Sequence, residues 1–379
     1  MMKIACITTS IVPSKTANSI QAVKVVHALK QTGHDVRLWV PEFQKGTWEE
    51  IAEIYGISDK FEITWLPFKK GMKQYDFSWR SVQAAKMWDA DVVYTWALQA
   101  AAFAAVRGIP TAMEFHDFPM GFMGPKLFRL LMALPASKLI MTTTRALADG
   151  IEDRFGMAFS PEELQVAPNG TDPERYQGLP QPEEARRQLG LPQVFTVGYT
   201  GHFYPGRGMN LLTGVAKNNP GIHFLWVGGR EKDIQPWRET LAAESIDNVT
   251  ITGFIPNARL PLYQAAADIL AMPYAKKIAG SSGGNIAPVI NPMKMFDYIS
   301  AGRPIIASNI PVFHEVLTNQ IALFCDPYDV GEWSAAIEKL KNDTNLRRSM
   351  SAASLAAADH YSWINRAKRS LSKLEKIIQ

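Results

Sequence analysis

The feature of this chain that most constrains its fold is an alternation of short β-branched or aromatic runs with helical patterns, and this alternation occurs twice. In the first half, the runs that read as strands cover residues 3–9, 35–40, 62–67, 91–96, 110–116, 139–144 and 165–168. In the second half, they cover residues 195–201, 223–229, 249–255, 268–274, 304–308 and 322–326. Strands that alternate with helices are typical of parallel sheets covered by helices. The sequence therefore predicts an α/β protein with two doubly wound, Rossmann-like domains.

A turn-rich segment between the two series predicts the domain boundary. Residues 168–173 read Pro-Asn-Gly-Thr-Asp-Pro, and no strand pattern follows before residue 193. We therefore predict a first domain over residues 1–170, a hinge over 171–192 and a second domain over 193–358. The last segment, 359–379, reads as a basic helix that crosses back to the first domain. Because ligands bind beyond the carboxyl ends of the strands in such sheets, we expect the domains to face each other across a ligand-binding cleft.

Charge and cysteine usage exclude several classes of protein. The formal net charge is only +4, and the basic residues form no long run, which disfavours nucleic-acid binding. The two cysteines, Cys6 and Cys325, lie in different halves, so that neither a disulfide framework nor a metal site is predicted. No apolar stretch approaches the roughly 18 residues of a membrane span, and the N-terminus lacks a signal-peptide pattern. We expect a cytoplasmic protein that requires no metal.

The first motif with chemical meaning follows the strand at 195–200. Residues 201–208 read Gly-His-Phe-Tyr-Pro-Gly-Arg-Gly and lead into a helical pattern that opens at Met209. Glycines let backbone amides approach an anion, a helix N-terminus adds positive potential, and Arg207 offers a bidentate phosphate donor. An ordinary strand-to-helix turn with a solvated arginine is the alternative interpretation.

A second motif combines the glycine-serine loop 280–284 with the helical pattern that begins near Pro292. Proline favours the first helical position, and Asn291 before it is expected to cap the helix. Lys294 and Asp297 are three residues apart and share one helix face. A pyrophosphate at this helix start would meet free N–H groups and Lys294, while Asp297 would accept hydrogen bonds from ribose hydroxyls. The alternative is that Lys294 and Asp297 simply pair with each other.

The block over residues 291–308, Asn-Pro-Met-Lys-Met-Phe-Asp-Tyr-Ile-Ser-Ala-Gly-Arg-Pro-Ile-Ile-Ala-Ser, resembles the retaining family-4 glycosyltransferases, and further similar segments cover nearly the whole chain. These segments are 13–40, 114–117, 142–148, 169–172, 201–208, 253–256 and 361–367. The resemblance implies the two-domain GT-B fold. It also implies transfer of a hexosyl or related sugar, with retention of configuration, from a nucleoside-diphosphate donor, UDP or GDP being the expected nucleotides. No further cofactor is implied.

By the same resemblance, individual residues receive roles. Asp297 matches the second acid of the family's acid-x7-acid motif, which holds the ribose, whereas the position of the first acid is Val289. Its duty near the donor sugar is then expected to fall to the loop of residues 281–285. The expected catalytic residues are His116, which faces the transferred sugar, Arg207 and Lys294. The expected donor-binding residues are Gly201, His202, Gly208, Phe254, Ile255, Ser282, Gly283, Asn291, Met293 and Asp297.

Two of these assignments have structural alternatives. His116 lies at a strand end, where a histidine is often only a structural hydrogen-bonding group, and its neighbours Glu114 and Asp117 are weaker candidates. His202 stands where many relatives carry a second basic phosphate ligand. The turn that holds Phe254 and Ile255 is expected to meet the nucleobase through backbone atoms, but a plain strand-to-helix corner fits equally well.

The acceptor is expected to be a hydroxyl group on a sugar or a lipid-linked molecule, in cell-surface polysaccharide or glycolipid synthesis. Residues 118–134 combine many large apolar side chains with Lys126 and Arg129, which is typical of a helix on the inner membrane surface. A core helix is the alternative. For the whole chain, a nucleotide-sugar epimerase and a binding protein that has lost catalysis stay open. A dinucleotide-dependent dehydrogenase is disfavoured, since no Gly-x-Gly-x-x-Gly follows the first strand.

Overall fold

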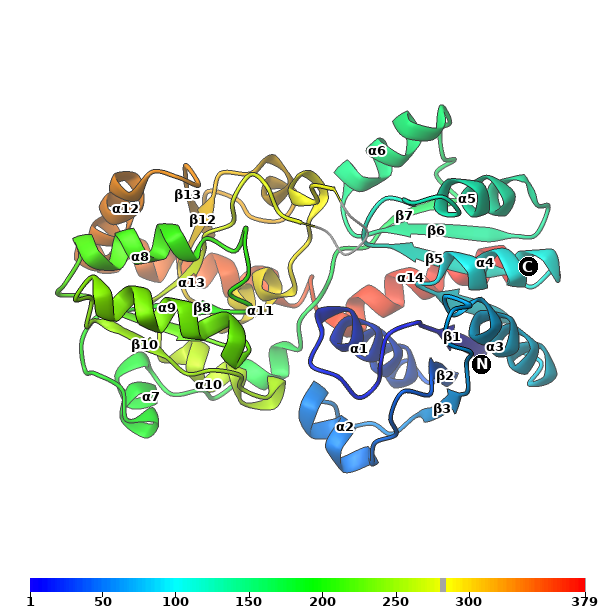
Figure 1. Ribbon diagram of the computed structural model, residues 1–379, viewed down its shortest axis with the longest axis horizontal. Helices are drawn as coiled ribbons and strands as arrows, with labels where there is room; N and C mark the ends of the chain where they lie inside the picture. Colours follow the sequence, from blue (N-terminus) through cyan, green and yellow to red (C-terminus); the bar gives the residue numbers. More distant parts are fainter. Residues whose placement is uncertain (280–283, 379) are drawn as a thin grey trace. The chain divides into compact units, whose positions relative to one another are not determined.

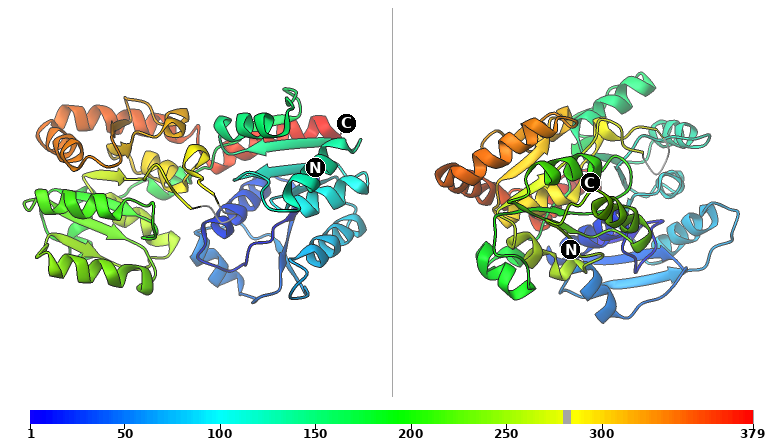
Figure 2. Two further views of the ribbon diagram at one scale, coloured as in Figure 1. Left: turned by 45° about the horizontal axis from the view of Figure 1, so that its top comes forward. Right: turned by 60° about the vertical axis from the view of Figure 1, so that its left-hand side comes forward.

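The computed structural model describes residues 1–279 and 284–378 and contains two compact units. The first unit comprises Met1–Asn169 and Trp363–Gln379, and the second comprises Gly170–Ser362. Each unit is built on one parallel sheet with helices on both faces (Figure 1 and Figure 2). The prediction of two doubly wound α/β domains is confirmed.

The sheet of the first unit has the strand order β3-β2-β1-β4-β5-β6-β7. Its strands are β1 (Lys3–Ile7), β2 (Asp35–Pro41), β3 (Glu62–Leu66), β4 (Val92–Thr95), β5 (Thr111–Phe115), β6 (Lys138–Thr142) and β7 (Leu164–Val166). Its helices are α1 (Ala17–Gln31), α2 (Trp48–Tyr55), α3 (Tyr75–Met87), α4 (Leu98–Val106), α5 (Gly124–Ala133), α6 (Arg145–Phe155) and α14 (Trp363–Ile378). The central strand β1 is covered on both faces, which explains why Ile4, Cys6 and Ile7 are fully buried.

The sheet of the second unit has the order β10-β9-β8-β11-β12-β13. Its strands are β8 (Thr196–Thr200), β9 (His223–Val227), β10 (Val249–Ile251), β11 (Ile269–Met272), β12 (Ile305–Ser308) and β13 (Ala322–Cys325). Its α-helices are α7 (Pro182–Leu189), α8 (Met209–Asn218), α9 (Glu231–Ala243), α10 (Leu260–Ala265), α11 (Met293–Ala301), α12 (Val330–Asn342) and α13 (Thr344–Ala358). The core between sheet and helices includes the large buried side chains of Phe224, Trp226 and Trp333.

The segment predicted as a hinge, residues 171–192, lies within the second unit. It contains the short 3-10 helix Pro173–Tyr176 and helix α7. Arg186 on α7 is buried and donates hydrogen bonds to the Asp268 carboxylate at 2.8 Å and to the Ala266 carbonyl at 3.0 Å. These bonds fasten α7 to the end of the segment that leads into β11.

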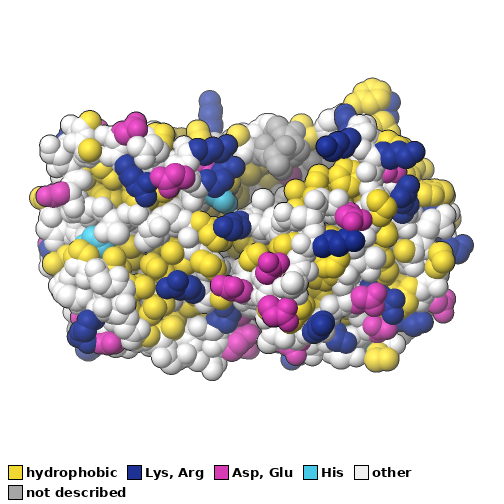
Figure 3. All heavy atoms as spheres, turned by 60° about the horizontal axis from the view of Figure 1, so that its bottom comes forward, with side chains coloured by type: hydrophobic (Ala, Val, Ile, Leu, Met, Phe, Trp, Pro, Cys, Tyr) yellow, Lys and Arg dark blue, Asp and Glu magenta, His cyan; other side chains and the backbone are white. Residues whose placement is uncertain are grey.

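The final helix, α14, is part of the first unit, where it contacts α1 and β6. Its buried face carries Trp363, Arg366, Ala367, Leu371 and Leu374. Its exposed side carries basic residues. On the face of the molecule drawn in Figure 3, Lys and Arg side chains are interspersed with Asp and Glu side chains.

Candidate functional site

The carboxyl ends of three adjacent strands in the second unit are joined through glycines. Gly201 follows β8 and donates a backbone hydrogen bond to the Val227 carbonyl at 2.8 Å, and Gly228 donates to the Gly253 carbonyl at 2.9 Å. A Cβ atom on Gly228 would lie 2.4 Å from the Gly201 carbonyl oxygen, so that no larger residue fits there. The strand ends therefore present closely packed backbone at the edge where doubly wound sheets bind ligands.

The predicted turn 201–208 is held rigidly before α8. Gly208 has φ +79°, and a Cβ atom there would lie only 1.6 Å from the Pro273 carbonyl oxygen. Glycine is required here for two reasons: the backbone is left-handed, and it lies very close to the segment that follows β11. The left-handed backbone and the close packing together fix the position of the neighbouring Arg207.

We expect Gly208→Ala to reduce the free energy of unfolding by more than about 4 kcal/mol, because the backbone overlap adds to the left-handed strain. Gly190→Ala in the same unit is the matched control. Gly190 has φ +66° but no atom near its Cβ position, so that only the strain of about 1–2 kcal/mol is expected. Denaturant unfolding measures both losses, and equal losses would contradict the steric account.

Arg207 and Lys294 lie together among tyrosine rings. The Lys294 ammonium is 3.7 Å from the ring centre of Tyr199 and 5.3 Å from that of Tyr274. The Arg207 guanidinium is 5.0 Å from the Tyr274 ring centre and donates a 2.6 Å hydrogen bond to the Tyr204 hydroxyl. The structure therefore brings two of the predicted residues into one cationic cluster.

Lys294 also lies against the backbone of the glycine turn. A Cβ atom on Gly201 would be 2.7 Å from the Lys294 Nζ atom, so that glycine is required for this approach. The tyrosines of the cluster were missed in the sequence, although Tyr199 lies in β8 and Tyr274 lies two residues beyond β11. Their positions at the carboxyl ends of predicted strands were the available signal.

Within the described part of the chain, the Lys294 Nζ, the Arg207 Nε and the His202 Nδ1 atoms are buried without a hydrogen-bond partner. Burial, and then the charge of Arg207, hold the pKa of Lys294 well below its usual range. Burial and the same two cations lower the pKa of His202. Two buried cationic groups without a hydrogen-bonded anion are unfavourable by themselves. The cluster therefore has the electrostatics of an anion-binding site.

The helix that carries Lys294 begins one residue later than predicted. Helix α11 starts at Met293 with the extended Pro292 as its N-cap, so that the predicted capping position of Asn291 is wrong. Lys294 and Asp297 do not form the hydrogen-bonded pair considered as an alternative, since the Lys294 ammonium has no hydrogen-bond partner among residues 1–279 and 284–378. The Asp297 carboxylate instead accepts a 3.4 Å hydrogen bond from the Thr171 hydroxyl.

The other residues predicted to bind the donor differ in how far they are buried. Val289, at the position of the absent first acid, is only 2% exposed and packs within the unit. Phe254 is exposed and Ile255 half-buried beyond β10, where Gly253 pairs with Gly228. Ser282 and Gly283 lie outside the described residues.

The first unit holds a cavity of about 560 Å³ at the carboxyl ends of β1, β4 and β5. His116, which directly follows β5, is partly exposed and lines this cavity together with Asp117. Other polar lining residues are Thr9, Asn18, Gln21, Lys73 and Gln99. The placement matches the edge at which parallel sheets bind ligands.

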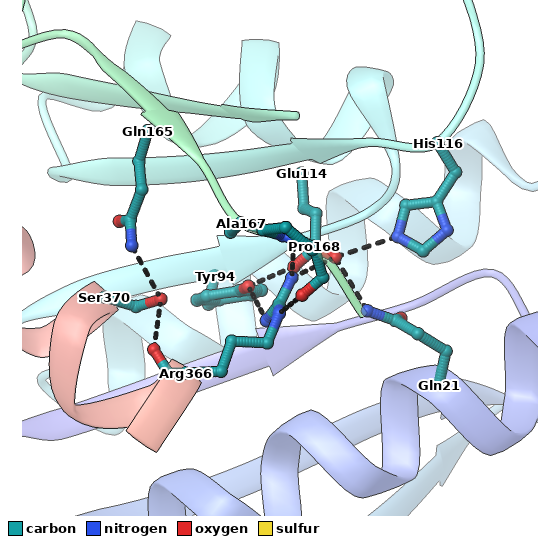
Figure 4. A network of polar contacts seen from close by, with 9 residues as sticks. All are labelled: Gln21, Tyr94, Glu114, His116, Gln165, Ala167, Pro168, Arg366 and Ser370. Carbon is teal, nitrogen blue, oxygen red and sulfur yellow. Dashed lines mark hydrogen bonds and ion pairs between the residues drawn. The ribbon is translucent and has the colours of Figure 1, made fainter. Parts of the chain in front are cut away.

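Beneath His116 lies a buried network centred on Glu114 (Figure 4). The Glu114 Oε1 atom accepts hydrogen bonds from Gln21 at 2.7 Å, from His116 at 2.8 Å and from Arg366 at 2.7 Å. Tyr94 donates to the other carboxylate oxygen. Burial works to raise the pKa of Glu114, but the charge of Arg366 and these hydrogen bonds lower it to about 2. Glu114 is therefore a carboxylate at neutral pH.

Arg366 also ties α14 to the end of the first domain. It donates to the Pro168 carbonyl at 2.8 Å and to the Ala167 carbonyl at 3.1 Å, and it is 2% exposed. Glu114, a weak candidate in the sequence, is 1% exposed and holds its neighbours in place rather than facing solvent. A lone acid inside an otherwise apolar strand was the signal for such a buried ion pair.

Two family models match the chain. The model described as Glycosyltransferase Family 4 matches residues 19–175, and that described as Glycosyl transferases group 1 matches residues 181–355. A glycosyltransferase model therefore matches each of the two domains, the family 4 model the first and the group 1 model the second.

Curated relatives are similar over part of their length. A D-inositol 3-phosphate glycosyltransferase of Segniliparus rotundus is 26% identical over 215 residues, 54% of this chain and 45% of the relative. A GDP-mannose-dependent alpha-(1-6)-phosphatidylinositol monomannoside mannosyltransferase of Mycobacterium tuberculosis is 27% identical over 242 residues, 58% of this chain and 60% of the relative. The chain thus spans about half the length of the curated relatives it matches.

Solved structures share the whole fold. Anabaena Alr3699/HepE in complex with UDP aligns with a TM-score of 0.76 and 18% identity, over 99% of this chain and 100% of that one. A glycosyltransferase from Rickettsia africae aligns with a TM-score of 0.79 and 12% identity, over 100% and 99%. The GT-B architecture is therefore established.

Neither a bilayer-spanning helix nor a metal cluster occurs in the described part of the molecule. No helix there combines the length and apolarity needed to cross a membrane. No group of three or more His, Cys, Asp or Glu side chains there is placed to hold a metal ion.

Proposed function

We propose that this chain, which belongs to the GT-B glycosyltransferases of the family 4 and group 1 type, transfers a sugar from a nucleoside-diphosphate sugar to a hydroxyl acceptor with retention of configuration. The observation that carries this proposal is the cluster of Arg207 and Lys294 at the strand ends of the second sheet, two buried basic side chains for which the described residues supply no hydrogen-bonded anion. A diphosphate would supply the missing negative charge.

In the proposed reaction, the bond between the anomeric carbon and the diphosphate oxygen breaks, and its electron pair stays on the diphosphate. Arg207, Lys294 and the backbone amides at the start of α11 stabilise this leaving charge. The acceptor oxygen forms the new bond on the same face of the sugar, and its proton passes to the diphosphate oxygen. Groups fixed before the reaction stabilise charge best, and the glycine contacts of the turn 201–208 fix Arg207.

We propose that the rest of the nucleotide lies along the strand ends of the second unit. Gly201, His202 and Gly208 would meet the pyrophosphate, Asp297 the ribose, and the turn with Phe254 and Ile255 the base. With buried Val289 in place of the first acid, sugar selectivity would depend on other groups. UDP and GDP are the candidate nucleotides, since relatives are named with UDP and with GDP-mannose.

A thermal-shift screen with UDP, GDP and ADP tests donor binding, because a ligand that binds only the folded state raises the melting temperature. One of the diphosphates is expected to raise it in the intact protein and to fail with Arg207→Ala. If none of the three raises the melting temperature, the proposal that the donor binds at this cluster is wrong.

The names of the relatives favour sugar transfer over the two alternatives, a nucleotide-sugar epimerase and a binding protein without catalysis.

Nucleotide binding is expected to take up protons through Lys294. In the ligand-free protein, burial and the charge of Arg207 lower the pKa of Lys294. A bound diphosphate raises this pKa again, because its negative charge favours the protonated form of Lys294. Affinity should therefore be highest at low pH and fall as pH rises through the pKa of the complex. Calorimetric titration of UDP at pH 8 in two buffers of different ionisation enthalpy measures the uptake. It should disappear in Lys294→Met, and equal enthalpies in both buffers would contradict it.

We further propose that the cavity of the first unit holds the acceptor and that the surface around α5 contacts an anionic membrane. Helix α5 buries Leu127, Phe128 and Leu131, so that one of its faces belongs to the core, as the alternative interpretation predicted. The preceding loop leaves Phe122 78% exposed, with the Lys126 ammonium 3.8 Å from its ring centre. Arg129 and Leu130 are also exposed, which is the composition of an interfacial surface.

Liposome flotation with vesicles of phosphatidylglycerol and phosphatidylcholine tests the contact. The wild type is expected to float with these vesicles but not with phosphatidylcholine alone, and the double variant Phe122→Ser with Leu130→Ser should lose most of the bound fraction. Met87→Ser, at an apolar side chain on α3 that is 87% exposed, is the control and should float like wild type. A wild type that stays at the bottom of the gradient would exclude membrane contact.

A further inference from the structure

Glu114 determines which hydrogen-bonding groups the cavity wall of the first unit presents. Glu114 Oε1 accepts hydrogen bonds from Gln21, His116 and Arg366, all at 2.7–2.8 Å. In Figure 4, Arg366 reaches the carboxylate from one side, whereas Gln21 and His116 reach it from the other. Both of these latter residues line the cavity. Whatever fixes Glu114 therefore also fixes two groups of the cavity wall.

An ionised carboxylate has no proton to donate, so that each of its partners must be a donor. Arg366, which is always charged, keeps Glu114 ionised at 2.7 Å in a fully buried position. Gln21 must consequently point its NH2 group at Glu114. His116 must carry its proton on Nε2, because that nitrogen lies 2.8 Å from the carboxylate.

Because Gln21 and His116 both donate to Glu114, the atoms that they turn away from Glu114 are hydrogen-bond acceptors. The Gln21 Oε1 atom points away from Glu114 and is a buried carbonyl oxygen without a hydrogen-bond partner among the described residues. A neutral His116 with its proton on Nε2 has a bare Nδ1 atom, which is an acceptor. The ligand groups that satisfy two neighbouring acceptors are donors, and the donors of a neutral sugar or polyol are its hydroxyl groups.

We propose that Glu114 and Arg366 are positioning residues that hold His116 in the Nε2-protonated tautomer and Gln21 with its carbonyl oxygen free, so that this wall of the cavity recognises hydroxyl groups of an uncharged ring. The proposal rests on the proposed sugar transfer for the source of that ring, either the transferred sugar or the acceptor. A phosphate group has no place beside these acceptors and the Asp117 carboxylate. Lys73, on the segment ahead of α3, is the cation that lines the same cavity elsewhere.

Long-range proton–nitrogen NMR spectra of histidine-labelled protein test the tautomer without relying on transfer activity. At pH 8 the wild type should show His116, assigned by its loss in His116→Asn, with a protonated Nε2 and a bare Nδ1. The double variant Glu114→Gln with Arg366→Met should let a measurable fraction of the proton move to Nδ1, because an amide that no longer accepts from Arg366 can present either polarity to His116. Tyr94→Phe, which removes a donor to the other carboxylate oxygen, should leave the tautomer unchanged.

A wild-type His116 protonated on Nδ1 would overturn the proposal, and so would an unchanged tautomer in the folded double variant. If the double variant does not fold, the wild-type spectrum alone decides. In a transfer assay, kcat/KM for the double variant should fall about tenfold, the loss expected from one or two misplaced hydrogen bonds.

Ligand titrations identify the source of the hydroxyl group. If UDP-glucose or GDP-mannose moves the His116 Nδ1 signal while UDP and GDP do not, the hydroxyl belongs to the transferred sugar. If only methyl mannoside or inositol moves it, the hydroxyl belongs to the acceptor. A signal that none of these probes moves would contradict hydroxyl recognition, while the thermal-shift result with UDP and GDP would still stand for the donor site.

Discussion

Arg207→Ala is expected to slow sugar transfer by about 100-fold or more at saturating donor, because one fixed donor to a developing oxyanion is worth about 3 kcal/mol in the transition state. The guanidinium is held by the Tyr204 hydroxyl and the Tyr274 ring, and its Nε atom has no hydrogen-bond partner among the described residues. It is therefore positioned before the donor binds. Steady-state rates of nucleotide release measure the effect.

Arg238→Ala is the matched control for this prediction. Arg238 lies exposed on α9 of the same unit and pairs with Glu231 on the surface, so that turnover should stay within about twofold of wild type. Thermal unfolding of both variants checks that the fold is intact. Turnover of a folded Arg207→Ala protein close to wild type would refute the catalytic role of Arg207.

The second large effect is expected from Arg366→Met, which should lower the free energy of unfolding by about 3–5 kcal/mol. The substitution keeps much of the side-chain volume but leaves the buried Glu114 carboxylate without its cation. It also removes the hydrogen bonds that Arg366 donates to Ala167 and Pro168. Denaturant unfolding measures the loss, and a loss below about 1 kcal/mol would contradict the account of the network.

Two further variants separate charge from packing. Lys368 lies exposed on the same helix, so that Lys368→Met should change the free energy of unfolding by less than about 0.5 kcal/mol. The double variant Glu114→Gln with Arg366→Met removes the stranded charge as well. The double variant should therefore recover part of the free energy of unfolding that Arg366→Met loses. If the losses of the two single variants simply add in the double variant, the two side chains do not interact.

The fold was predictable from the sequence because the central parallel strands of both sheets are covered on both faces. Such strands appear as short apolar runs, of which the segment around Cys6 in β1 is typical. The turn that carries Gly201, Arg207 and Gly208 was also predictable, since it lies directly between a predicted strand and a predicted helix start. Lys294 could be added because α11 begins with a recognisable proline motif.

The remaining features depend on tertiary contacts that local patterns do not encode. Glu114 and Arg366 are 252 residues apart, and nothing near either residue indicates its partner. Tyr199 and Tyr274 come together only because β8 and β11 are neighbours in the sheet. Asn291 was misjudged by one position because Pro292, which favours the first helical residue, here takes the extended cap conformation instead.

The proposed activity is tested most directly by incubating the purified protein with UDP-glucose or GDP-mannose, each with a hydroxyl acceptor, and determining the configuration of the product by NMR. We expect a new glycosidic bond of retained configuration together with one released nucleoside diphosphate, and a rate about 100-fold lower for Arg207→Ala. Donor returned unchanged, or converted to an epimer without any acceptor product, would contradict sugar transfer by this protein.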